Sequence, residues 1–116
     1  MKDILQAIAN DDDYEIIELI KQGADPNARD DQGIPALHIA AKSDLWMCTD
    51  ALLNNGANPD VLDSQGRSAL FIAAALDKET VASQLREHGA NIRLRDDQGM
   101  DAQKITVIAD KPRLVW

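Results

Sequence analysis

The chain is poor in aromatic residues and in cysteine. Aromatic side chains make up 3% of its 116 residues, so the core has to be built from Leu, Ile and Ala. Its single cysteine, Cys48, cannot form a disulfide within the chain. The opening stretch MKDILQAIANDDD has acidic residues where a secretory signal needs an apolar run and a small-residue cleavage site. We therefore expect a protein of a reducing, cytoplasmic compartment whose core consists of close helix contacts.

Long apolar runs and positive charge are also scarce. No stretch approaches the roughly 18 consecutive apolar residues of a membrane span, so no membrane association is predicted. Residues 1–63 hold 4 basic and 13 acidic side chains, a net charge of -9, and residues 64–116 hold 8 and 7, a net charge of +1. The negative half repels phosphate backbones and attracts basic proteins. The one basic cluster, Arg86, Arg93 and Arg95, has no interleaved aromatic residue, so nucleic-acid binding is not predicted.

The segment GADPNARDDQG, residues 23–33, looks at first like a calcium loop because it holds three aspartates and an asparagine. Counted from its first aspartate, position 5 is Arg29 and position 12 is Ala36, where the ion needs oxygen ligands. Two later near-copies, residues 56–66 and 89–99, do not keep the acidic side chains at the same positions. The pattern therefore indicates scaffold, and neither a metal nor a cofactor is predicted.

A period of 33 residues dominates the sequence. Gly23, Gly56 and Gly89 are spaced by this period, and residues 31–63 align with residues 64–96 without a gap. A further unit fits upstream in the same register, and a shorter one begins downstream. We predict one domain, 1–116, composed of the units 1–30, 31–63, 64–96 and a partial C-terminal cap, 97–116.

Each unit has the pattern of helix, turn, helix, loop. The apolar residues within 36–41 are spaced for a short helix, and those within 45–53 for a second one. Gly56 then supplies the left-handed residue that ends a helix, and Pro59 prevents its continuation. One aspartate recurs at each junction of the two helices: Asp11, Asp44, Asp77 and Asp110. Because Asp tolerates the left-handed conformation and caps helix N-termini, we predict a structural role rather than an acidic ladder for a ligand.

Together these features resemble the ankyrin repeat. The family pattern, in rough form D-x-x-G-x-T-P-L-H-x-A-A and then a helix ending L-L-x-x-G-A-D/N, is matched by DDQGIPALHIAA and ALLNNGANPD. The resemblance covers essentially the whole chain and implies an all-α solenoid of stacked helix-turn-helix units with protruding loop or β-turn fingers. The family's Thr-Pro pair is replaced, and its histidine is kept only at His38. We therefore expect incomplete threonine-to-histidine hydrogen bonding between repeats and a modest stability.

The resemblance also implies a binding surface. In ankyrin proteins, partners typically dock on a concave surface made of the loop tips and the exposed face of the first helix. Carried onto this chain, those positions are Asp31, Gln32, Ile34, Lys42, Ser43, Ser64, Gln65, Arg67, Ala75, Leu76, Asp97, Gln98 and Met100. Ile34 and Met100 are apolar at places predicted to be exposed, with Arg67 between them. An apolar strip that contains arginine and has a polar rim is typical of an interface.

Other residues that carry reactive or aromatic groups are interpreted mainly as structural. His38 is expected to form structural hydrogen bonds, His88 to complement the dipole at a helix end, and Cys48 to be a small buried hydrophobic residue. No catalytic pair, zinc motif or phosphate loop is present, so no enzymatic activity is predicted. Trp46, on the side opposite to the concave surface, either covers a seam between repeats or anchors a partner protein. We expect Trp116 to cover the open end of the stack.

The sequence therefore predicts a chain, monomeric on its own, whose function is to bind another protein. Its small size and acidic half suggest an inhibitor, an immunity protein or an adaptor for a more basic partner. The first alternative is a structural unit that self-associates through an uncapped repeat end. A remote alternative is a hydrolase built on Asp11, Asp12, Asp13 and His38.

Overall fold

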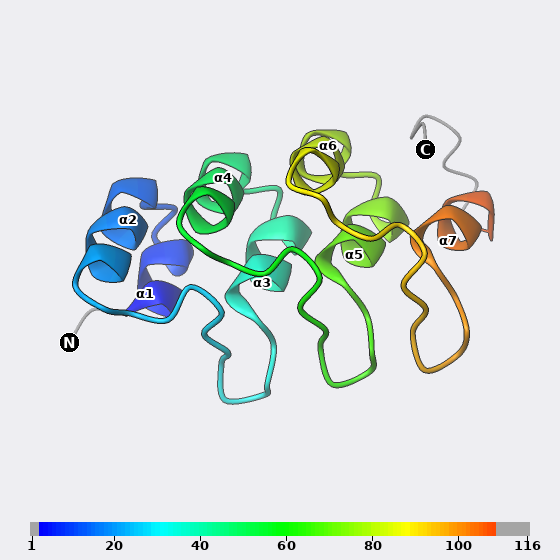
Figure 1. Cartoon of the computed structure of the whole chain (residues 1–116), viewed down its shortest axis with the longest axis horizontal. Helices are drawn as coiled ribbons and strands as arrows, with labels where there is room; N and C mark the ends of the chain where they lie inside the picture. The colour runs from blue at the N-terminus through cyan, green and yellow to red at the C-terminus, as the bar shows by residue number, and fades with distance from the viewer. Residues whose placement is uncertain (1–2, 109–116) are drawn as a thin grey trace.

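The helices lie in two parallel rows, and the loops between units project from one side as fingers (Figure 1). The computed structural model describes residues 3–108, and the regular secondary structure in that part of the chain is helical. The inner row comprises α1 (Ile4–Ala9), α3 (Ala36–Lys42), α5 (Ala69–Ala75) and α7 (Ala102–Ile108). The outer row comprises α2 (Asp13–Lys21), α4 (Trp46–Asn54) and α6 (Glu79–Glu87). The predicted all-α solenoid with protruding fingers is confirmed, whereas the division into four units within one domain stays a prediction.

The rows are held together by small and aliphatic side chains. Each inner helix packs against the next inner helix, each outer helix packs against the next outer one, and the two helices of a unit pack against each other. The pairs Ala40–Ala41 and Ala73–Ala74 are fully buried in α3 and α5, and their small side chains allow the helix backbones to approach closely. The large buried side chains are mainly leucine and isoleucine, for example Ile16, Leu52 and Leu70. The core is therefore of the predicted composition.

The helix junctions use aspartate as a left-handed residue, as predicted. The φ angles are positive at three of them: Asp11 (51°), Asp44 (57°) and Asp77 (61°). The predicted capping role of these aspartates is wrong, because the N-cap of each outer helix is the residue that follows. Of these N-caps, Asp12 accepts a hydrogen bond from the Glu15 N–H at 3.1 Å, whereas Leu45 and Lys78 have no side-chain cap bond. Asp110 lies outside the described residues.

One aspartate orders each finger. Oδ1 of Asp30 accepts the backbone N–H groups of Gln32 and Ile34, both at 2.9 Å. The backbone N–H of Asp30 donates in turn to the carbonyl of Ile34 at 3.0 Å. Asp63 and Asp96 make the equivalent bonds in the next two fingers. Asp30, one of the acidic residues that make the segment look like a calcium loop, therefore binds backbone N–H groups of its own finger.

Successive repeats are also joined by a side-chain ladder between their loops. The side-chain oxygen of Asn27 accepts the backbone N–H of Asn58 at 2.8 Å, and Oδ1 of Asp60 accepts that of Asn91 at 2.7 Å. The third residue in this register is Arg93, whose side chain has no acceptor atom. The ladder therefore connects three successive loops, at positions where the sequence alone shows only polar residues.

The finger bonds lead to a prediction about two adjacent aspartates. Asp30→Ala removes the acceptor of two backbone N–H groups, and we expect the free energy of unfolding to fall by about 1–2 kcal/mol. Asp31→Ala, at the exposed finger tip, is the matched control and should change it by less than about 0.5 kcal/mol. Urea denaturation followed by circular dichroism measures both values. Equal effects of the two substitutions would contradict the proposed role of Asp30.

Candidate functional site

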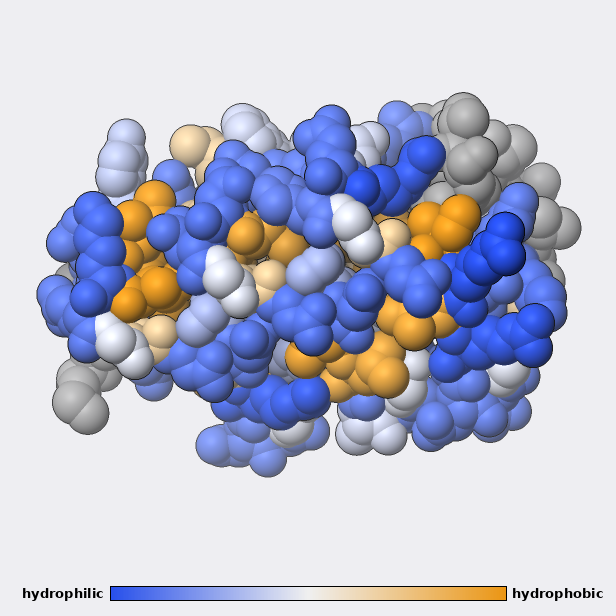
Figure 2. Space-filling view, viewed as in Figure 1, coloured by the Kyte–Doolittle hydropathy of each residue, from blue (hydrophilic) through white to orange (hydrophobic). Residues whose placement is uncertain are grey.

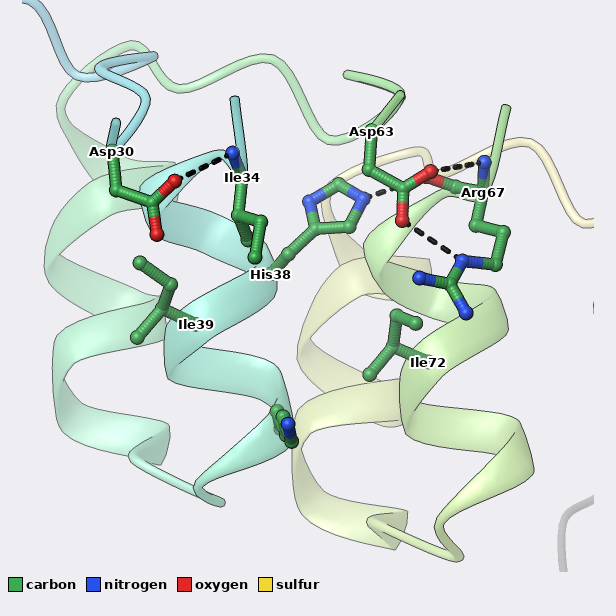
Figure 3. A pocket seen from close by; sticks show the side chains of 8 residues that line it. Asp30, Ile34, His38, Ile39, Asp63, Arg67 and Ile72 are labelled. Carbon is green, nitrogen blue, oxygen red and sulfur yellow. Dashed lines mark hydrogen bonds and ion pairs between the residues drawn. The ribbon is translucent and has the colours of Figure 1, made fainter. Parts of the chain in front are cut away.

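A groove of about 300 Å³ lies where the fingers meet the inner helices α3 and α5 (Figure 3). We call this side of the molecule the concave face. Ile34 enters the groove from the first finger, Ile39 from α3 and Ile72 from α5. The other lining residues are polar or charged: Asp30, His38, Lys42, Asp63 and Arg67. The groove thus combines an apolar surface with charges of both signs.

The charged groups of the groove are held in place by the finger structure. Nε of Arg67 lies 2.9 Å from Oδ2 of Asp63, and the Arg67 backbone N–H donates to Oδ1 of the same carboxylate at 2.8 Å. Burial alone would raise the pKa of Asp63, but the hydrogen bonds from Arg67 and Gln65 outweigh it and hold the pKa below its ordinary value. Two acidic and two basic residues line the groove, so its charges balance.

His38 connects two repeats beneath this groove. Its Nε2 lies 2.6 Å from the backbone carbonyl oxygen of Arg67 in the next repeat. Because a carbonyl only accepts, Nε2 carries the proton and Nδ1 is left as an acceptor, buried without a partner. Burial lowers the pKa of His38, against the smaller opposing effect of the bond to Arg67. The lowered pKa favours the uncharged ring, and the bond to the Arg67 carbonyl confirms the predicted structural hydrogen-bonding role of His38.

The polar residues predicted to form the concave surface are exposed at the finger tips. Asp31 and Gln32 lie on the first finger, Ser64 and Gln65 on the second, and Asp97 and Gln98 on the third. The last two fingers also contact each other, because the Asp97 N–H donates to the Gln65 carbonyl at 3.1 Å. Gly66 beside this contact has a φ of 74°, and a Cβ there would lie 3.3 Å from the Asp97 backbone nitrogen, so the position favours glycine. The side chains at the finger tips are therefore exposed, while hydrogen bonds order the backbone of the fingers that carry them.

The remaining predicted residues differ in where the structure places them. Lys42, Ser43 and Leu76 are exposed and Ala75 is partly buried, all at the C-terminal ends of the inner helices. The apolar side chains of Ile34 and Met100 were expected to be exposed, but both are partly buried. The reason is that Asp30 and Asp96 bind their backbone N–H groups and so fix them at the base of the fingers.

The groove brings together three of the predicted residues with five that the sequence did not indicate. Ile34, Lys42 and Arg67 were predicted. Asp30, His38, Ile39, Asp63 and Ile72 were not assigned to a binding surface. Ile39 and Ile72 are one period apart, each directly before a buried alanine pair. The sequence signal that could have predicted both residues is an isoleucine repeated every 33 positions on the helix face opposite to the alanine pair.

Trp46 is exposed at the start of α4 in the outer row, away from the fingers. Trp46 is 51% exposed, and its two predicted roles, covering a partly buried seam and anchoring a partner, both stay predictions. Its backbone carbonyl accepts a hydrogen bond from Gln84 Nε2 at 2.8 Å. The residue therefore ties α4 to α6 through its backbone while its indole ring stays at the surface. Trp116 lies outside the described residues.

The groups considered for hydrolysis have separate structural partners. Oδ1 of Asp11 accepts from the Cys48 thiol at 3.4 Å, Asp12 caps α2, and His38 binds the Arg67 carbonyl. Cys48 is fully buried, as predicted, and burial together with Asp11 raises its pKa to about 12. The Cys48–Asp11 contact pairs a thiol with a carboxylate, but it raises the pKa of the thiol and so does not activate it as a nucleophile.

Stacked helical hairpins with ordered fingers define a repeat solenoid, a class whose extended concave surfaces bind partners. The sequence matches the family described as ankyrin repeats, with three copies over residues 4–96, and the chain belongs to the ankyrin-repeat family. A comparison with curated proteins gives no significant match. Ankyrin repeats are generally protein–protein interaction modules and typically lack catalytic activity. None of the helices in residues 3–108 is long and apolar enough to span a bilayer.

The pKa of His38 leads to a prediction about pH. Because the native pKa lies below the ordinary value of 6.5, the unfolded chain binds more protons than the native chain below that pH. We expect the free energy of unfolding to decrease as the pH falls below 6.5. The decrease should be smaller in His38→Gln, whose amide can donate to the same carbonyl without titrating. Urea denaturation from about pH 8 to about pH 5 measures this, and parallel curves for the two proteins would contradict it.

The burial of Cys48 leads to a second prediction. Its thiol is inaccessible and its pKa is raised to about 12, so alkylation by iodoacetamide at neutral pH should be at least about a hundredfold slower in the native than in the unfolded protein. Mass spectrometry follows the modified fraction over time. Ser43→Cys in a Cys48→Ala background is the control, because position 43 is exposed and should react at the rate of the unfolded chain. Similar rates for native and unfolded Cys48 would refute the prediction.

Proposed function

We propose that the chain is a non-catalytic module that binds a partner protein through its concave face and finger tips. The observation that supports this most directly is the groove between α3 and α5, because it offers an apolar surface and oriented charges in one concavity. Its three isoleucines suit an aliphatic or aromatic side chain of a partner. The salt bridge to Asp63 keeps Arg67 at the groove edge, which lowers the entropy cost of an interfacial arginine.

The residues around the groove have the composition expected of a protein interface, with apolar side chains at the centre and polar ones at the finger tips. Figure 2 shows one face of the molecule, with hydrophilic residues over most of it and hydrophobic side chains in separate areas. The polar tips, from Asp31 and Gln32 to Asp97 and Gln98, supply hydrogen-bonding groups at the rim. An apolar centre within a polar rim is the usual anatomy of a non-obligate interface. This favours a partner that also exists free in solution.

The narrower proposal is that the chain is an inhibitor, an immunity protein or an adaptor for a more basic partner. It is supported by the small size of the chain and by the net charge of -9 on residues 1–63 against +1 on residues 64–116. Opposite charges raise the association rate of such pairs. The cytoplasmic location and the monomeric state remain predictions from the sequence.

The proposed binding surface can be tested by affinity capture from a lysate of the source organism, followed by mass spectrometry. We expect the double variant Arg67→Glu/Met100→Glu to lose at least about tenfold of the captured partner, because it alters the groove edge and the third finger together. The measurement is the ratio of captured partner between variant and wild type, with unfolding curves to show that both are folded.

The control for this experiment is Ser83→Glu/Arg93→Glu, which changes the net charge by the same amount at exposed positions outside the groove. This variant should capture the partner as well as the wild type does. An equal loss in both double variants would show that net charge, and not the concave face, determines binding. No loss in either would refute the proposed surface.

A further inference from the structure

A second concavity lies on the outer row, between α2 and α4. We call it the outer groove; its volume is about 380 Å³. Its apolar lining comprises Ile17, Trp46, Met47 and Ala51, and its acidic residues are Asp13 and Asp50. In Figure 1 the outer row lies on the side of the inner helices away from the fingers, so a partner docked here would leave the concave face free.

The repeats of the chain itself show that Trp46 departs from what the helix requires. The first residue of each outer helix is Asp13 in α2, Trp46 in α4 and Glu79 in α6. An acidic side chain there favours the helix dipole, and a tryptophan does not. Trp46 is 51% exposed and the next residue, Met47, is 46% exposed. Two adjacent large apolar side chains in water at a position that favours an acid point to a binding role.

The aromatic side chain is also carried on a fixed backbone. The Trp46 N–H donates to the Asp44 carbonyl at 3.0 Å, and its own carbonyl accepts from Gln84 Nε2 at 2.8 Å. The following residues, Cys48 and Thr49, are fully buried and anchor this turn of α4 in the core. A tryptophan presented in this way loses little freedom when it binds, which is the property of an interface anchor.

Charge separates the outer groove from the concave groove. The helices α2 and α4 together hold four acidic residues, Asp13, Glu15, Glu18 and Asp50, and one basic residue, Lys21, for a net charge of -3. Nζ of that lysine lies 3.6 Å from a Glu18 carboxylate oxygen. The concave groove, in contrast, has two acidic and two basic residues. The outer groove itself is lined by two acidic residues, Asp13 and Asp50, and by no basic one, so its lining is negatively charged.

We propose that the outer groove binds a cationic segment of a partner protein, with an apolar side chain against Ile17, Trp46 and Met47. Lysine or arginine residues of that segment pair with Asp13 and Asp50, and one of them stacks on the exposed indole ring. The inference rests on the proposed function as a protein-binding module and assigns the basic partner to the outer face. The concave face then remains available for a second contact.

The test uses a helical peptide of Leu and Lys residues as the probe and the same peptide with Glu in place of Lys as its counterpart. The protein carries Trp116→Phe, so that Trp46 is its only tryptophan and reports binding by fluorescence. We expect the Lys peptide to bind and the Glu peptide not to bind, with an affinity for the Lys peptide that falls as salt is added. Asp13→Asn/Asp50→Asn should weaken binding about tenfold. Trp46→Ala should weaken binding roughly 30-fold. Because this variant lacks the tryptophan reporter, a fluorescent label on the peptide measures its binding.

The control is Arg67→Glu/Met100→Glu, which alters only the concave face and should keep at least the wild-type affinity for the Lys peptide. If this variant loses binding and the outer-groove variants keep it, the peptide binds the concave face. That result would contradict the proposed outer site and support the concave one. Equal binding of both peptides would overturn the charge assignment. Sedimentation tests the alternative that a second copy of the chain occupies the outer groove. If the protein is a dimer and Trp46→Ala makes it a monomer, the groove is a self-association site and the proposal fails. Unfolding curves confirm that every variant is folded.

Discussion

The close approach of neighbouring inner helices is the contact on which the rest of the structure depends. The alanine pairs of α3 and α5 are fully buried there, so the helix backbones approach closely and the repeats stack in register. This register places His38 opposite the carbonyl of Arg67 in the next repeat, and Asn27 opposite the N–H of Asn58. Larger side chains between the helices would separate both pairs. The hydrogen bonds between repeats are therefore a consequence of the packing.

The same stacking creates two surfaces with different chemistry. On the concave face the fingers are ordered by aspartates that bind their own backbone. Arg67 pairs with one of these carboxylates, and with Lys42 it balances the two acidic residues of the groove. On the outer row, by contrast, acidic side chains flank an apolar groove around Trp46. A chain of 116 residues can thus have two candidate recognition surfaces, because the repeats stack in one direction and leave the outer sides of both helix rows accessible.

Much of the candidate binding site could not be predicted from the sequence, because the groove is lined by residues from neighbouring repeats. Ile39 and Ile72 lie 33 positions apart and share one groove only because α3 and α5 are adjacent. Met100 was expected to be exposed, but the Asp96 bond to its backbone N–H draws it to the base of its finger. The sequence favours neither interpretation of Trp46, since an indole suits a seam and a surface alike, and a residue that is 51% exposed fits both.

The amino-acid sequence by itself determined the repeat, the helical hairpin within it and the left-handed positions, because period, apolar spacing and residues such as Gly56 and Asp44 act within one unit. It also determined the composition of the core and the uneven charge. Only the tertiary structure decided which carboxylates are occupied by backbone N–H groups and that Asp44 precedes the helix cap. It alone decided how the charge divides between the concave face and the outer row. Those properties depend on distances between units, which a local pattern does not contain.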